Sequence, residues 1–275
     1  GGFRPARNPR PPKETMTEQG SASELLSQAY ERLREADLPG ASARLDDALS
    51  ADFESEEILF ALACAAWWKE KLERLDGSSS PFERGEFILS QWKGFLAFQS
   101  RRPGDYDDAR YGFKRFAFLT ALREFRALGP EDAESWEPEL ALRIGRCLKG
   151  SGDYAGAMDT LEPVARERKD SPEVLAELAD VYALVNENRT AKALFREAFF
   201  LNPQRVDTAF LECPAIVRLV DHIRSLGFRS PELEEWIPVY GSLLGVFSVK
   251  RERKPIAPSR LRQSISGMEN EANEK

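Results

Sequence analysis

The chain has 275 residues, a formal net charge of −7, and 42% hydrophobic residues. That length and composition allow one large domain or two small ones with a real core. No run of about 18 apolar residues is present, so the sequence predicts no membrane-spanning helix.

The charge is unevenly distributed along the chain. Residues 1–15 carry +3, residues 16–249 carry −13, residues 250–262 carry +5, and residues 263–275 carry −2. An acidic body argues against nucleic-acid binding by the body itself. The basic segments from Arg4 to Lys13 and from Lys250 to Arg262 are where such binding would occur.

Three cysteines, Cys64, Cys147 and Cys213, lie far apart in apolar, helical contexts. Their odd number and spacing predict buried free thiols in a reducing compartment. The first residues carry arginines and prolines without the apolar segment of a secretory signal. We therefore expect a cytoplasmic location, in a bacterial-type cell.

Residues 1–20 are rich in Pro, Arg and Gly and are predicted to be a disordered basic tail. A first helix is expected over 21–36, where apolar residues recur at helical spacing. Asp37 to Gly40 then forms a turn, and a second helix follows with small and apolar residues on one face. Residues 22–55 thus form a first helical hairpin.

Residues 56–75 are expected to form a long helix that ends at a Gly-Ser-Ser-Ser-Pro segment. The next helix, over 82–102, belongs to another hairpin, 90–123, so the helix over 56–75 has no hairpin partner in sequence. Between Ala109 and its counterpart Ala157 the spacing is 48 residues rather than 34. We therefore predict an irregular middle section.

Residues 138–205 contain the same hairpin twice, 34 positions apart. Self-similarity at this period is typical of stacked two-helix units. The paired positions are Gly145 with Ala179, Ile144 with Leu178, Leu148 with Tyr182, Ala157 with Ala191, Leu161 with Phe195, and Val164 with Ala198. Small residues at such positions allow close helix approach, and large ones fill the gaps between hairpins.

These residues resemble the tetratricopeptide repeat (TPR) family. The second copy carries Leu178-Ala179, Tyr182, Ala191, Phe195, Ala198 and Pro203, close to the family pattern, whereas the first has Val164 and Lys169 at its last two pattern positions. The resemblance implies an all-α, TPR-like stack of antiparallel hairpins, an α-solenoid. The repeat domain would span 21–250, with clear copies at 138–171 and 172–205 and weaker ones at 22–55 and 90–123.

After Pro203 the repeat pattern decays. Residues 207–213 and 215–226 are predicted to be helical, and a further helix should begin near Pro231. Together they would form a helical C-terminal cap, because end repeats are usually atypical. Residues 251–275 are expected to be a tail.

Residues for catalysis are sparse. The single histidine, His222, is expected to be a surface helical residue beside Asp221. No Cys/His cluster has metal-ligand spacing, and no glycine-rich loop follows a strand. We therefore predict no enzyme activity and no catalytic, metal or cofactor site.

The resemblance also implies a concave groove lined by first helices, with ligand positions that include Glu139, Leu142, Arg146, Lys149, Glu173 and Asp180. Arg143 and Glu177 flank them. One interpretation is that Arg143, Arg146 and Lys149 clamp a carboxylate-bearing peptide. The other is that Arg146 and Asp180, in the same register on neighbouring helices, pair with each other.

Trp67, Trp68 and Trp92 mark an aromatic-rich segment. Core packing is one interpretation, and an exposed docking patch for a partner or a second copy is the other.

The sequence therefore predicts a non-enzymatic protein–protein interaction scaffold that binds a partner through its helical-repeat surface. One alternative is a nucleic-acid-associated regulator that uses the basic tails. Another is a structural spacer or oligomerisation subunit of a larger assembly. Neither the partner's identity nor the oligomeric state is indicated by the sequence.

Overall fold

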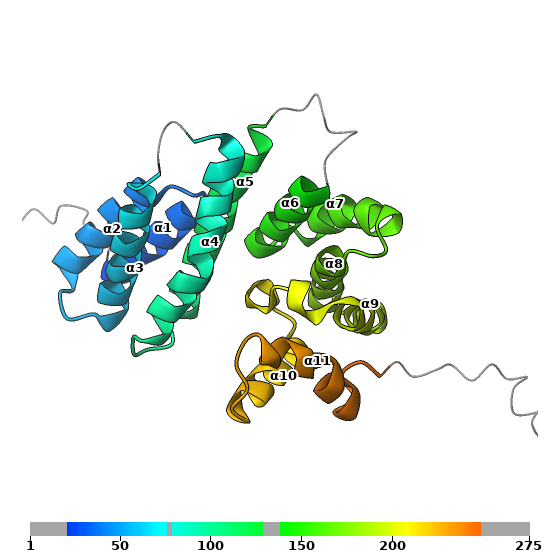
Figure 1. Cartoon of the computed structure of the whole chain (residues 1–275). Coiled ribbons are helices and arrows are strands. Elements are labelled where there is room, and N and C mark those ends of the chain that lie inside the picture. Colours follow the sequence, from blue (N-terminus) through cyan, green and yellow to red (C-terminus); the bar gives the residue numbers. More distant parts are fainter. Residues whose placement is uncertain (1–20, 76–78, 129–137, 249–275) are drawn as a thin grey trace, which may run out of the picture. The chain divides into compact units, whose positions relative to one another are not determined.

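In the computed structural model, which describes residues 21–75, 79–128 and 138–248, every regular element is a helix (Figure 1). This confirms the all-α fold class. No helix in those ranges is long and apolar enough to cross a membrane. The predicted tails, 1–20 and 251–275, lie outside the described residues.

The described residues divide into two compact units, one within 21–128 together with 150–152 and the other over 138–149 and 153–248. The first unit contains helices α1 (Ala22–Arg34), α2 (Leu38–Ala51), α3 (Glu56–Leu72), α4 (Pro81–Ser100) and α5 (Asp107–Arg126). The second contains α6 (Pro138–Ser151) as far as residue 149, α7 (Tyr154–Glu167), α8 (Pro172–Leu184), α9 (Asn188–Leu201), α10 (Pro214–Ser225) and α11 (Glu232–Leu243), with two short 3-10 turns before α10. The division coincides with the segment in which the repeat register breaks.

Three hairpins share one spacing. In α1–α2, α6–α7 and α8–α9 the second helix begins 16 residues after the first, and α8 begins 34 residues after α6. The internal repeat of 138–205 is therefore present in the structure as two hairpins with equivalent bounds.

The turn inside each of these hairpins is also the same. In each turn, the residue just before the N-cap of the second helix has a positive φ: Ala36 (59°), Gly152 (89°) and Asn186 (67°). The next backbone N–H then donates to the carbonyl five residues earlier, at 2.9 Å from Asp37 to Arg32, 2.9 Å from Asp153 to Leu148 and 2.8 Å from Glu187 to Tyr182. This bond pattern satisfies carbonyls that a helix end would otherwise leave unpaired.

Small residues lie at the helix crossings of the second unit, as predicted. Ala157 and Ala179 are fully buried, and Ala191 is 2% exposed. A Cβ atom on Gly145 would lie 2.5 Å from Cγ of Leu161, so α6 and α7 approach as closely as they do because no side chain intervenes. The large residues Leu161 and Phe195 are buried beside them.

In the first unit, α1 packs against both α2 and α5, α4 packs against α5, and α3 packs mainly along α2. The unpaired helix predicted over 56–75 is present as α3. Helices α4 and α5 have 20 residues each, longer than the 14 of α7 and α9. The hairpin predicted at 90–123 is therefore built from longer helices than the regular repeats.

The predicted helix over 207–213 is wrong. The structure has one 3-10 turn at Pro203–Arg205, another at Thr208–Phe210, and extended backbone at Leu211 and Cys213. Two reasons are visible. Pro214 disfavours helical backbone at the residue before it, and the Asp180 carboxylate accepts hydrogen bonds from the backbone N–H groups of Glu212 and Cys213.

We expect Ala191→Trp to destabilise the protein by about 2–4 kcal/mol, because a tight α8–α9 crossing cannot accept the added volume. Chemical denaturation followed by circular dichroism measures this. Ala155→Trp, at an exposed position of α7, is the matched control and should change stability little. Equal stability of the two variants would show that Ala191 does not lie at a close crossing.

Candidate partner-binding surfaces

Lys149, on α6, is 1% exposed and lies among oxygen atoms of its own chain. Its Nζ donates to Glu177 at 2.5 Å, to Asp180 at 2.8 Å, and to the carbonyl of Phe210 at 2.9 Å. Glu177 and Asp180, both on α8, are themselves 1% and 0% exposed. The three side chains form a buried ion network that ties α6, α8 and the 3-10 segment together.

The network holds its members in their charged forms. Burial by itself favours the neutral form of Lys149, but the carboxylates of Asp180 and Glu177 outweigh it and raise the pKa of the ammonium above its ordinary 10.5. For Glu177, burial acts to raise the pKa, and the cations of Arg146 and Lys149 overcome it, so the pKa lies below the ordinary 4.5. Both shifts stabilise the folded state near neutral pH.

Arg146 lies at the outer edge of this network. Its Nε donates to Glu177 at 2.6 Å, and its guanidinium lies 4.0 Å from the centroid of the Phe210 ring. Phe210 belongs to the chain's own 3-10 segment, so this segment covers the part of the α6–α8 face that the family resemblance assigned to a ligand. Charges on α6 and α8, the first helices of the two repeats, therefore pair with each other. Arg146, however, pairs with Glu177 and not with Asp180.

The peptide clamp predicted from Arg143, Arg146 and Lys149 therefore needs correction. An ammonium that is 1% exposed and donates to two carboxylates and a backbone carbonyl has no donor to offer a partner. Glu177 and Asp180 are buried as well and accept hydrogen bonds from Lys149, so they are not accessible to a partner either. Lys149, Glu177 and Asp180 are instead the polar core of the α6–α8 contact.

The accessible remainder of that groove is a pocket of about 190 Å³ in the second unit. Arg143 and three predicted groove positions line it, namely Glu139, Leu142 and Glu173. Glu173 accepts from Arg205 Nε at 2.6 Å and from the Ser171 hydroxyl at 3.1 Å. Since cations and carboxylates alternate around this pocket, its charge favours no single class of ligand.

The aromatic segment of the first unit is mostly core. Trp68 is fully buried and Trp92 is 7% exposed, and both pack against Phe95, with ring centroids 5.2 and 5.8 Å from it. The core-packing interpretation therefore holds for these two. Trp67 is half-buried, between the rings of Trp68 and Phe98, and Lys71 Nζ lies 5.2 Å from its centroid.

Helix α3 has apolar residues on its outward side as well as its inward one. Ile58, Ala61, Ala65 and Trp68 face the core, whereas Leu59 is 47% exposed. Ala66 is exposed and Ala63 is half-buried, whereas Leu62, also half-buried, lies at the border of the stripe and packs against the core residues Leu25, Ala48 and Ile58. Residues 59, 62, 63 and 66 follow the i, i+3, i+4, i+7 spacing of a single helix face. We call these four residues the outer stripe of α3.

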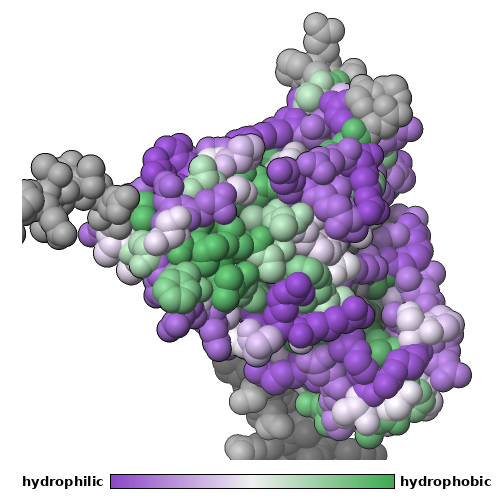
Figure 2. All heavy atoms as spheres, turned by 90° about the vertical axis from the view of Figure 1, so that its left-hand side faces the viewer, coloured by the Kyte–Doolittle hydropathy of each residue, from purple (hydrophilic) through white to green (hydrophobic). Residues whose placement is uncertain are grey.

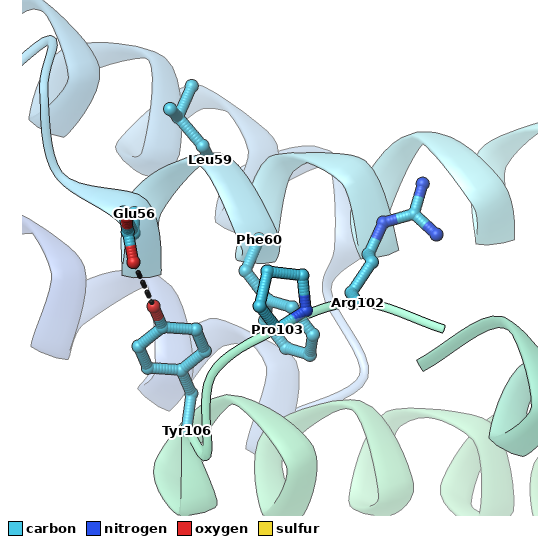
Figure 3. A pocket seen from close by; sticks show the side chains of 6 residues that line it. All are labelled: Glu56, Leu59, Phe60, Arg102, Pro103 and Tyr106. Carbon is cyan, nitrogen blue, oxygen red and sulfur yellow. Dashed lines mark hydrogen bonds between the residues drawn. The ribbon is translucent and has the colours of Figure 1, made fainter. Parts of the chain in front are cut away.

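A pocket of about 270 Å³ lies beside the outer stripe, between the start of α3 and the residues that join α4 to α5. Leu59, Phe60, Pro103 and Tyr106 supply its apolar surface (Figure 3). Glu56 and the Tyr106 hydroxyl reach toward one another, with 3.5 Å between their oxygens, while Arg102 lies on the other side. The view that looks onto the side of the first unit where α2 and α3 lie shows hydrophobic residues gathered into a patch with hydrophilic ones around it (Figure 2).

No known family model matches this chain, and no curated protein matches it significantly.

The repeat spacing predicts an unpaired helix over 56–75, but it does not single out Leu59, Leu62 or Ala66 as a surface. A signal was present, because the apolar residues of 58–68 surround the whole helix, whereas a helix with one buried side needs a single stripe. The Arg102–Tyr106 side of the pocket could not be found in this way, since it meets α3 only in the folded unit.

Replacing Lys149 with Met should cost about 3–5 kcal/mol, because it leaves the buried Asp180 without a cation and Glu177 with Arg146 alone. Denaturant titration monitored by circular dichroism tests this. The control is Arg166→Gln, which removes the exposed Arg166–Glu162 pair on α7 and should cost about 1 kcal/mol or less. If both variants lose the same small amount, the buried network contributes little.

The pKa shift of Glu177 also predicts a pH dependence. Its folded-state pKa lies below the ordinary 4.5, so its contribution is present above that value and is lost as pH falls through the folded pKa. Between about pH 7 and about pH 3, we expect the unfolding free energy of the Glu177→Gln variant to fall less than that of the wild type. Unfolding free energies measured at both pH values give this difference, and equal losses would contradict the assignment.

Proposed function

We propose that this protein is a non-enzymatic, TPR-like scaffold that binds a partner protein through a surface of its helical hairpins. The family pattern of residues 172–205 supports the TPR-like description, as does the 34-residue spacing of α6 and α8. Repeat proteins of stacked hairpins commonly present extended binding surfaces.

The observation that carries this proposal is the outer stripe of α3. A helix at the surface of a folded protein normally turns polar residues outward, because exposed apolar area is unfavourable in water. Here Leu59 and Ala66 are exposed and Leu62 and Ala63 are partly exposed, next to a pocket with an apolar floor. A contiguous apolar surface of this kind is typical of a site that another protein covers.

The proposed working surface therefore lies on the first unit and not at the groove positions of α6 and α8. The network of Lys149, Glu177 and Asp180 serves to hold the second unit together. The second unit would then act as a folded support, with the pocket of Arg143 and Glu173 as its remaining accessible cavity.

Two alternatives to the scaffold function are also hypotheses. The nucleic-acid hypothesis depends on basic segments that lie outside the described residues, and the spacer hypothesis requires no accessible site. Deleting both basic segments would abolish nucleic-acid binding but not partner binding by a scaffold. Salt is a second test, because phosphate-driven binding weakens steeply as salt rises.

A photo-cross-linking amino acid at Ala66 tests the proposal. Cells that express the full chain with this substitution should yield a discrete cross-linked protein, because Ala66 lies exposed in the outer stripe. The same group at Ala155, exposed on α7 of the second unit, is the control and should not yield that product. Absence of any product specific to position 66 would overturn the proposed surface.

A further inference from the structure

Acidic side chains are concentrated in the segment that leads into the outer stripe. Residues 44–57, from α2 to the first turn of α3, contain six carboxylates and one cation. That cation, Arg44, pairs with Asp47 at 3.1 Å, and Glu57 accepts from the Tyr30 hydroxyl at 2.8 Å. The side chains of Asp46, Asp52, Glu54 and Glu56 are exposed at the surface.

The opposite end of α3 carries balanced charge. Glu70 lies 3.5 Å from Lys71 Nζ and also pairs with Arg74, one turn further on. A partner that covers the stripe would therefore meet a strongly negative potential at the start of α3 and a nearly neutral one at its end. Such an asymmetry fixes both the sign of charge on the partner and its direction along α3.

The pocket beside Leu59 is suited to an apolar anchor. Its floor is Phe60, which is 5% exposed, together with Pro103. Among the described lining residues the cation is Arg102, which is held in place by its own chain: the guanidinium carbon lies 3.5 Å from the Phe98 centroid, and Nη1 donates to the Phe98 carbonyl at 3.2 Å. Glu56, in contrast, is exposed and has a long contact to Tyr106, so a partner's cation can reach it.

From these observations we infer that the outer stripe of α3 binds a cationic amphipathic helix of a partner protein. The apolar face of that helix covers Leu59, Leu62, Ala63 and Ala66, and one large apolar side chain enters the pocket. Its lysines or arginines lie over Glu54 and Glu56. Helix recognition by i, i+3, i+4, i+7 anchors is a common mode of peptide binding, and the acidic end of α3 selects among such helices. The inference rests on the proposed function, since it names the class of partner for the same surface.

The probe is a fluorescein-labelled peptide of about 18 residues, with leucines at that spacing and lysines elsewhere. A second peptide has glutamates in place of the lysines. Fluorescence anisotropy with the full chain should show at least tenfold tighter binding of the lysine peptide. The affinity should fall at higher salt but not vanish, because apolar contacts contribute to it.

Two substitutions in the protein test the two halves of the interaction. Leu59→Asp should weaken lysine-peptide binding at least tenfold, whereas Leu243→Asp, on a side chain that is 75% exposed in α11, should leave it unchanged. The double reversal Glu54→Lys and Glu56→Lys should reverse the preference toward the glutamate peptide. Glu232→Lys with Glu235→Lys makes the same charge change in the exposed first turn of α11 and is its matched control. Circular dichroism confirms that each variant is folded.

Three outcomes overturn the inference. Equal effects of the two charge reversals would mean that the peptide responds to net charge alone. An unlabelled peptide of residues 250–262 that displaces the probe only from chains with Leu59 would identify the chain's own basic segment as the occupant. A dimer by light scattering that Leu59→Asp dissociates, with no peptide binding, would identify a second copy.

The inference and the proposed function fail separately. A protein cross-linked from position 66, together with lysine and glutamate peptides that bind equally or not at all, would retain the scaffold and reject the cationic helix. Lysine-peptide binding that depends on Leu59, with no cross-linked protein, would retain the peptide-binding chemistry of the outer stripe and overturn its proposed role as the scaffold's partner surface.

Discussion

A helical hairpin cannot bury both of its faces by itself, and the whole structure follows from this constraint. Each hairpin has one side that faces its own partner helix and another that must be covered by a neighbour. In the second unit, α8 meets this condition with α7 and α9 on either side, and α11 covers part of α9. In the first unit, α3 has no hairpin partner in sequence, and its neighbours cover one side of it. The exposed part of the apolar stripe on α3 is the side that these neighbours leave uncovered.

The α6–α8 contact shows a different way of meeting the same condition. Where an apolar stack would place leucines, this contact contains Lys149 between Glu177 and Asp180, with Arg146 at the edge. Buried ion pairs are seldom more stabilising than apolar packing of the same volume, because desolvation of the charges offsets their attraction. What they add is specificity of register, since each charge has one set of partners. Asp180 extends that specificity to the chain's own 3-10 segment through the backbone of Glu212 and Cys213.

The two surfaces thus differ in what they leave accessible. On the α6–α8 face, the chain's own Phe210 and the ion network take the positions where the family resemblance placed a ligand. On α3, the residues near the acidic turn remain exposed, and the adjoining pocket has an apolar floor with a carboxylate at its rim. An apolar surface with charge at one end can discriminate among partners by orientation as well as by composition, which a uniformly apolar surface cannot.

The sequence by itself determined the helical class, the hairpins and their period. These depend on local physics: apolar spacing sets each helix, and Asp37 and Asp153 each start the next helix by accepting a backbone N–H from a glycine three residues on. The unpaired helix over 56–75 followed from the same arithmetic. The role of Lys149 was decided only by the tertiary structure, because its partners lie 28, 31 and 61 residues away. Periodicity places a charge on a helix face, but whether that face meets water or a carboxylate depends on segments far along the chain. The same holds for Phe210, which no repeat pattern assigns to the α6–α8 face, and for the pocket at Leu59, whose second side comes from residues 102–106.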